Sequence, residues 1–241
     1  EGAIDVTKND YDDGYLIGIG PLDQDFRDET TTDVGGRASY AISPDVAVFV
    51  QGKHSNVDYR VTSTPSRNSS QNYYQVGSSF ELTAPFRGDI AVGYLESKSK
   101  SGRDFDGPAV DGRLQWFPTQ ITTVTLVAAR SVFDPGLLQS SIAVDTAVSV
   151  HIDHELRRNI ILFGDLGYDN QDFQDFDRND KIVNFGVGVG YKLNRHARVD
   201  FGYTLRNQDS TGTGQDGTGA TIPQGPRFTD NIVSVSLRLF P

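Results

Sequence analysis

The most suggestive catalytic residue types in the chain are Ser149, His151 and Asp153, which alternate along one short segment. A serine nucleophile needs a base, and the base needs an orienting acid, so this trio raises the hypothesis of a hydrolase. The alternating pattern around it predicts a strand, however, and residues two apart on a strand are separated by about 6.6 Å of rise. Without a bulge we therefore expect no hydrogen-bonded relay, no catalytic residues and no enzyme activity.

Five aspartates gather in the segment 169–180, which reads DNQDFQDFDRND. Their carboxylate oxygens are of the kind that binds calcium. The segment lacks the glycine and the terminal glutamate of a recognised calcium-binding loop, so a solvated acidic loop is the favoured interpretation. We predict no metal site and no cofactor. The residues concerned are Asp169, Asp172, Asp175, Asp177 and Asp180.

The composition excludes several classes of protein. The 241 residues include no cysteine, which rules out disulfide scaffolds, thiolate metal sites and thiol nucleophiles. The formal net charge is -10 and no run of lysine or arginine follows any expected element, so nucleic acid is not an expected partner. No window approaches the roughly twenty apolar residues of a membrane helix. A membrane protein with this sequence would have to cross as a closed barrel of strands.

Alternation of apolar and polar side chains runs through most of the chain, as expected for strands, in which successive side chains point to opposite faces. We count about twelve such segments, each near the ten or so residues that a tilted strand needs to cross a bilayer. In the clearest ones the apolar face carries Val183, Phe185, Val187, Val189, Tyr191 and Leu193, or Val144, Thr146, Val148, Val150 and Ile152.

Short and long connections between these segments take turns along the chain. The short ones are 43–45, 84–88, 118–120, 154–158 and 194–196, and the long ones include 62–70, 169–180 and 209–227. Barrels of the bacterial outer membrane have short periplasmic turns and long extracellular loops. The pattern predicts an all-β fold, a transmembrane antiparallel up-and-down β-barrel, integral to the outer membrane, with this orientation.

We expect a single domain over residues 1–241, with the first strand at 1–12, an extracellular loop at 13–29 and the remaining strands at 30–241. The chain begins at Glu1 without a methionine or an apolar leader, so it is expected to be a processed protein or a part of a longer one.

A soluble barrel or sandwich would show the same alternation with its apolar face turned inward. About twelve strands enclose a wide lumen, and the polar face is rich in glycine, serine, aspartate and arginine, which suits a wet interior. Aromatic residues also collect near the strand ends, as in the two interfacial girdles of membrane barrels. They are Tyr40, Trp116, Tyr191 and Phe240 near the short turns, and Tyr94, Tyr168 and Tyr203 toward the long loops.

Charged residues of both signs occupy the polar face and are the candidate lining of a pore. Such charges create a transverse field that orients and selects solutes; the alternative is that they pair across strands and merely fill the barrel. The candidates are Asp33, Arg37, Lys53, Glu81, Asp89, Asp111, Arg113, Asp145, Asp165, Lys192, Arg198, Asp200, Arg206 and Arg238.

The last segment alternates up to Phe240 and resembles the C-terminal strand that the barrel-assembly machinery recognises, although Phe240 is one residue out of register and Pro241 follows it. Five further stretches resemble the putative β-barrel porin 2 family of α-proteobacteria and their relatives. They read GGRASYAISPDVAVFVQGKHSNVDYR, RGDIAVGYLESK, LQWFPTQITTVTLVAARSV, VSVHIDHELRRNIILFGDLGYDNQDF and GVGVGYKLNRHARVDFGYTLRNQDS. The resemblance implies an outer-membrane barrel, further strands ahead of the first one here, and an association with exopolysaccharide export loci.

The favoured function is passive: a porin-like channel or conduit for small hydrophilic solutes or for an exported polysaccharide chain. The alternative is a plugged structural barrel that docks a partner through its long loops or its periplasmic rim. Expected partners are outer-membrane lipid, lipopolysaccharide bridged to the acidic loop by divalent ions, the barrel-assembly machinery during biogenesis, and polysaccharide-export proteins.

Overall fold

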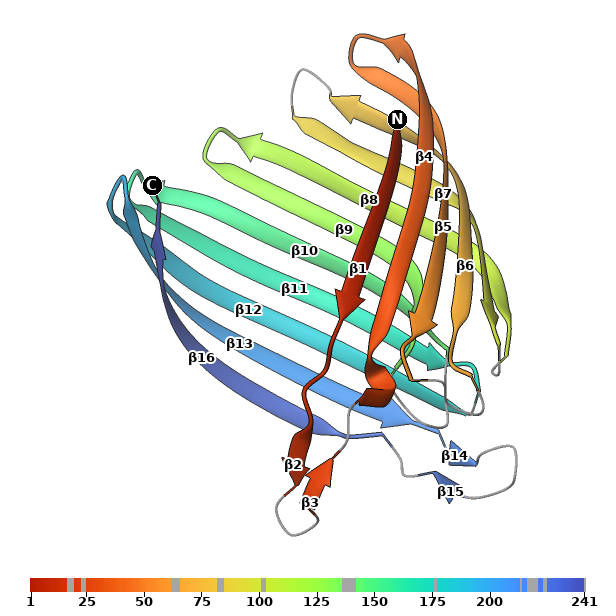
Figure 1. Ribbon diagram of the computed structural model, residues 1–241. Coiled ribbons are helices and arrows are strands. Elements are labelled where there is room, and N and C mark those ends of the chain that lie inside the picture. Colours follow the sequence, from red (N-terminus) through yellow and green to blue (C-terminus); the bar gives the residue numbers. More distant parts are fainter. Residues whose placement is uncertain are drawn as a thin grey trace.

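One antiparallel sheet of 12 strands, in which strands that follow one another in the chain are neighbours, makes up most of the computed structural model (Figure 1). The structure describes residues 1–16, 20–22, 25–61, 66–81, 85–100, 103–135, 142–175, 177–212, 214–215, 221–222 and 225–240. None of the helices among these residues is long and apolar enough to cross a membrane. The up-and-down order confirms the predicted fold class.

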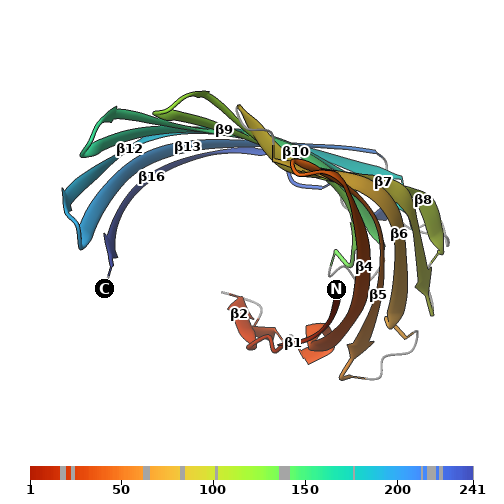
Figure 2. The ribbon, with the colours of Figure 1, turned by 90° about the horizontal axis from the view of Figure 1, so that it is seen from above.

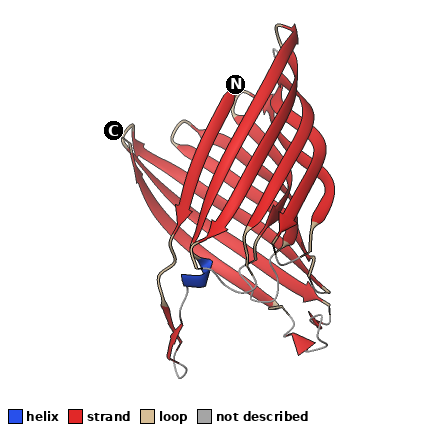
Figure 3. Ribbon diagram, turned by 45° about the vertical axis from the view of Figure 1, so that its right-hand side comes forward, coloured by secondary structure: helices blue, strands red, loops and turns tan. Residues whose placement is uncertain are grey.

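The strands of the sheet are β1 (Gly2–Asn9), β4 (Glu29–Ser43), β5 (Val46–Tyr59), β6 (Ser69–Glu81), β7 (Phe86–Ser99), β8 (Phe105–Thr119), β9 (Thr122–Phe133), β10 (Ala143–Arg157), β11 (Ile160–Phe173), β12 (Arg178–Asn194), β13 (Ala197–Thr211) and β16 (Phe228–Leu239). The long connections hold two small hairpins, β2 (Gly14–Leu16) with β3 (Gly20–Leu22) and β14 (Gly214–Gln215) with β15 (Thr221–Ile222), and a 3-10 turn, η1 (Asp25–Arg27) (Figure 3).

The register collects the apolar side chains on the convex face of the curved sheet. Val76 lies opposite Val92, and Val92 lies opposite Val110, so one apolar row crosses three neighbouring strands. These side chains are solvent-exposed, with Val92 at 53% and Val187 at 44% of their full accessible surface. Large apolar residues exposed in this number would be costly in water, whereas a lipid-facing surface requires them.

Tight two-residue turns join the strands at the upper end in Figure 1, and the long connections lie at the lower end. The described tight turns are Pro44–Asp45, Gln120–Ile121, Arg158–Asn159 and Arg195–His196. The predicted alternation of short and long connections is therefore correct, although residues 154–157 belong to β10 rather than to a turn.

The predicted acidic loop at 169–180 is wrong for most of its length. β11 continues to Phe173 and β12 already begins at Arg178, with Asp172 paired opposite Asn179. Aspartate and asparagine have low strand propensity, which made this stretch look like a loop. The ladder with the neighbouring strand overrides that local preference.

The sheet is barrel-like but not closed. β1 and β16 form its two edges, and each pairs with one neighbour only. Figure 2 shows the sheet from above as an open arc with β1 and β16 at its ends.

β8 and β9 are paired over only part of their lengths. Their pairing stops at Val110↔Arg130, whereas the pairing of β9 with β10 continues to Phe133↔Ala143. We call residues 130–134 and 142–145 the β9–β10 tip. It lies against the concave face of β5 to β8, because the Gln71 amide donates to the Val132 carbonyl at 3.3 Å.

An apolar cluster holds the β9–β10 tip in this place. Val132 and Val144 belong by alternation to the convex face, yet they pack in one buried cluster with Leu95 and Ala109 from the concave face. Val144 is 2% exposed, so its predicted position on the outward apolar face is wrong. Because the tip lies on the concave side of the sheet, the face of the tip that alternation assigns to lipid packs against the concave face of β7 and β8.

Candidate functional site: the concave face

Strand pairing places the predicted pore-lining charges on the concave face. Asp89 pairs opposite Arg113, Lys192 opposite Arg198, and Arg198 opposite Arg238, and directly paired residues share a face. Every other predicted charge falls on the same face by the same two-residue alternation.

Some of these charges form ion pairs, either across strands or within one strand. Arg37 lies 2.9 Å from Asp89, and Lys53 lies 2.8 Å from Asp33. Asp200 is 5% exposed and lies between two arginines, with its carboxylate oxygens 2.6 Å from Arg198 and 3.1 Å from Arg238. Lys192 reaches Glu155 at 3.9 Å.

Other predicted charges remain without an ion pair to any described residue; they are Glu81, Asp111, Arg113, Asp145 and Arg206. The concave face is therefore neither a closed network of pairs nor a wall of free charges. It keeps both acids and bases that could act on a passing solute.

Arg37 ties together strands that are not neighbours. Its guanidinium donates to Ser79 Oγ at 2.5 Å and to Asp89 Oδ1 at 2.9 Å, and it lies 3.5 Å from the ring centroid of Phe49. Arg37 thus links β4 to β6 and β7 across the concave face.

His151 is held by two carboxylates. Its Nδ1 lies 2.5 Å from Asp165 and its Nε2 lies 2.9 Å from Asp153. The expectation that side chains two residues apart would not meet is wrong for His151 and Asp153, whose side chains span the rise between the two positions. With each ring nitrogen facing a carboxylate, neither is directed at Ser149, and the trio does not form the geometry of a serine relay.

The five aspartates weighed as calcium ligands do not gather into one cluster. Asp180 is 1% exposed and accepts two hydrogen bonds from Arg178, at 2.8 and 2.5 Å. Asp172 accepts a bond from Gln174, and Asp169 accepts one from Asn184. Among the described residues no group of three or more histidine, aspartate or glutamate side chains is arranged to hold a metal ion.

A small ionic cluster fastens the connection between β1 and β4 to the end of β5. Arg60 lies 2.8 Å from Asp10 and 3.1 Å from Asp28. The hydrogen bond with Asp28 and the guanidinium of Arg60 hold the pKa of Asp10 below its usual value. This cluster anchors the base of a long connection.

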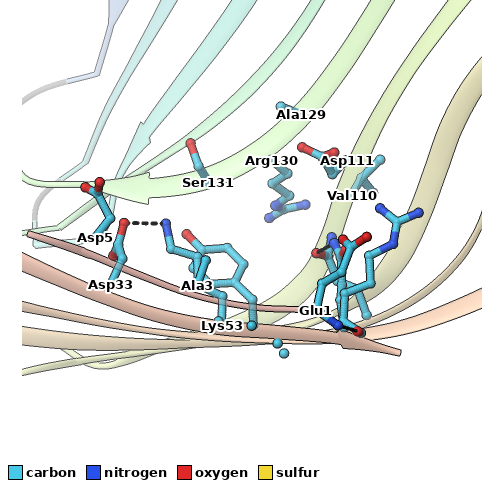
Figure 4. A pocket seen from close by; sticks show the side chains of 18 residues that line it. Glu1, Ala3, Asp5, Asp33, Lys53, Val110, Asp111, Ala129, Arg130 and Ser131 are labelled. Atoms are coloured by element: carbon cyan, nitrogen blue, oxygen red, sulfur yellow. Dashed lines mark hydrogen bonds and ion pairs between the residues drawn. The ribbon is translucent and has the colours of Figure 1, made fainter. Parts of the chain in front are cut away.

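Two cavities follow one another along the concave face. One, of about 450 Å³, lies at the turn end and is lined by Glu81, Arg87, Asp89, Arg113 and Gln115, among others. The second, of about 660 Å³, lies between β1, β4, β5 and β6 on one side and β8 and β9 on the other (Figure 4). Its charged lining consists of Glu1, Asp5, Asp33, Arg37, Lys53, Asp111 and Arg130.

Sequence reasoning missed Arg130. Alternation groups it with Val110 on the convex face, and the two residues are indeed paired. Arg130 reaches the cavity because β9 turns inward just after this pair, which a local pattern does not encode.

Sequence reasoning also missed the buried pair of Arg67 and Asp134. Their side chains are 9% and 13% exposed and lie 2.5 Å apart, and the Tyr59 hydroxyl donates to the same carboxylate at 2.6 Å. These residues come from β5, from the β5–β6 connection and from the end of β9. No sequence signal joins them.

Comparison with known proteins adds a family. The putative beta-barrel porin 2 family matches residues 1–228. No curated protein sequence matches the chain. Among solved structures, the outer-membrane expressed OmpT of Vibrio cholerae aligns with a TM-score of 0.44 and 11% identity, over 99% of this chain and 97% of that one. The trimer form of in-vitro folded OmpT aligns with a TM-score of 0.39 and 10% identity, over 99% of both chains.

The family match spans nearly the whole sheet, and it agrees with the apolar convex face, the polar concave face and the alternating connections. The chain therefore belongs to the putative beta-barrel porin 2 family and is a porin-like β-barrel protein integral to the outer membrane.

Proposed function

We propose that this protein is a passive outer-membrane channel or conduit for small hydrophilic solutes or for an exported polysaccharide chain. The observation that carries the proposal is the succession of two cavities, about 450 and 660 Å³, along a concave face lined by acids and bases. Polar groups that follow one another along a pore let a hydrated solute exchange hydrogen-bond partners as it moves. The proposal assigns no covalent chemistry and no cofactor to the barrel.

The same proposal fixes an orientation and a set of partners. The convex face would contact outer-membrane lipid, the tight turns would face the periplasm, and the long connections would face outward near lipopolysaccharide. The barrel-assembly machinery would act during biogenesis, and polysaccharide-export proteins would meet the periplasmic rim if the cargo is a polysaccharide.

One observation favours the alternative of a plugged structural barrel. The β9–β10 tip occupies part of the concave face and is packed there by a buried apolar cluster. If the tip closes the lumen, the long connections or the periplasmic rim would serve to dock a partner instead.

Single-channel recording of the folded protein in a planar bilayer, under a salt gradient, tests the proposal. We expect stable conductance steps and a reversal potential that moves toward cation preference in Arg113→Gln and in Arg206→Gln. A charge about 4 Å from a passing ion is worth about 1 kcal/mol in water, so the permeability ratio should change by up to about fivefold.

Arg195→Gln, in the tight turn between β12 and β13, is the matched control that removes a charge away from the concave face. A folded, heat-modifiable protein that gives no conductance would contradict the channel and favour the plugged barrel.

A further inference from the structure

We propose that the β9–β10 tip is the selectivity constriction of the channel and that Arg130 is the residue through which it attracts small anionic solutes. The inference rests on the proposed channel function and names the part of the concave face that selects. It is carried by three features: the anchoring of the tip, its packing and the uncompensated charge of Arg130.

The tip is anchored by polar contacts to strands that are not its sheet neighbours. Arg67 and Asp134 form a buried ion pair at 2.5 Å, and the Tyr59 hydroxyl adds a bond of 2.6 Å to the same carboxylate. The amide of Gln71 donates to the Val132 carbonyl at 3.3 Å. Breaking a buried pair leaves an uncompensated charge, so these contacts hold the tip inside rather than letting it follow β8 outward.

The packing under the tip is dry. Leu95 is fully buried, and Ile142 and Val144 are 1% and 2% exposed within one cluster. Phe105 and Tyr73 pack against the edge of this cluster. The tip is therefore a built part of the concave face, and its residues Arg130 and Ser131 line the 660 Å³ cavity.

Arg130 projects from the tip into that cavity (Figure 4). Its guanidinium lies 5.8 Å from the ring centroid of Phe105, and its buried Nε has no hydrogen-bond partner among the described residues. It also forms no ion pair within the described part of the chain. The other two cations of the cavity differ, because Lys53 is paired with Asp33 and Arg37 with Asp89.

Arg130 is thus the lining cation whose charge is left for a solute. Figure 4 shows Asp5 and Asp33 on the wall opposite Arg130 and Asp111 beside it, and Arg130 forms no ion pair with any of these carboxylates. A guanidinium offers a planar fork of donors that fits carboxylate and phosphate groups. Small solutes with such a group are the class that this position would retain and pass.

Reversal potentials in a potassium chloride gradient test the assignment. We expect Arg130→Gln to raise the potassium-to-chloride permeability ratio by about two- to fivefold, Arg130→Lys to restore most of the wild-type ratio, and Arg195→Gln to leave it unchanged. A conducting protein whose ratio does not respond to Arg130→Gln, while it responds to Arg113→Gln, overturns the inference and leaves the channel standing. A silent wild-type protein overturns both.

A cross-linking experiment tests the inward tip independently of conductance. The chain has no cysteine, so paired cysteines meet no background. We expect a short thiol cross-linker to join Gln71→Cys with Val132→Cys in the folded protein, because these residues touch across the concave face. If β9 instead stayed paired with β8 along its whole length, Val132 would lie three strands from Gln71 and on the opposite face of the sheet. The two cysteines would then not cross-link. Gln71→Cys with Val148→Cys, which stays on the convex face, is the negative control.

Discussion

At the residue scale, the assignment of the convex face to lipid can be tested at Val187. The side chain is 44% exposed on β12, whereas Thr204 on β13 lies on the concave face, opposite Gly186. An arginine facing the middle of the bilayer costs about 2–4 kcal/mol. We expect Val187→Arg to lower the free energy of unfolding by that amount, measured by denaturant titration of the protein folded into lipid vesicles.

Thr204→Arg is the matched control, because the same side chain would enter a polar interior and should change the unfolding free energy by less than about 1 kcal/mol. Equal losses in the two variants would contradict the division into a lipid face and a polar face. The strand propensity of arginine affects both variants alike, since both positions lie within strands, so it cancels in the comparison.

At the element scale, the junction of β11, β12 and β13 is held by a buried ion pair. Arg178 donates two hydrogen bonds to Asp180, and Gln208 of β13 donates a third at 3.3 Å. Removing one partner of a buried pair costs about 3–5 kcal/mol, because the other charge is left uncompensated. We expect Arg178→Gln to destabilise the folded barrel by that amount in the same denaturant titration.

The double variant Arg178→Gln with Asp180→Asn removes both charges and should recover much of the loss. A double variant no more stable than Arg178→Gln would show that the pair is not the cause. This junction is also where the sequence predicted a loop, so a large effect would show that its aspartates belong to the strand scaffold.

At the scale of the whole molecule, the open edges of the sheet make a prediction about the membrane. β1 and β16 each have one unpaired side, and unpaired backbone groups in hydrocarbon cost several kcal/mol each. In the bilayer both edges must be paired, either with each other or with further strands. We expect amide hydrogens of β1 and β16 to exchange as slowly as those of β11 when the protein is reconstituted in lipid.

Fast exchange confined to β1 and β16 in lipid, with slow exchange in β11, would mean that the edges stay open and would argue against a membrane-spanning sheet. The same measurement in detergent gives the reference, because water can reach the edges there.

The alternation of side chains predicted the number of strands, their faces and the rhythm of short and long connections. This was possible because a two-residue period is a local property of the extended backbone, readable from residues such as Val183 to Leu193. It also predicted that the charged residues share one face, and the register puts them on the concave face, while their role in lining a pore stays a prediction.

Only the tertiary structure shows where the two-residue alternation no longer tells which side of the sheet a residue lies on. Arg130 and Val144 keep the parity of the lipid face, yet both lie inside, because β9 separates from β8 and packs across strands distant in sequence. The ion pairs were equally out of reach: Asp134 meets Arg67 from another part of the sheet, and Asp180 turns a predicted loop into a buried junction. Such contacts depend on the curvature and sliding of whole strands, which no local pattern specifies.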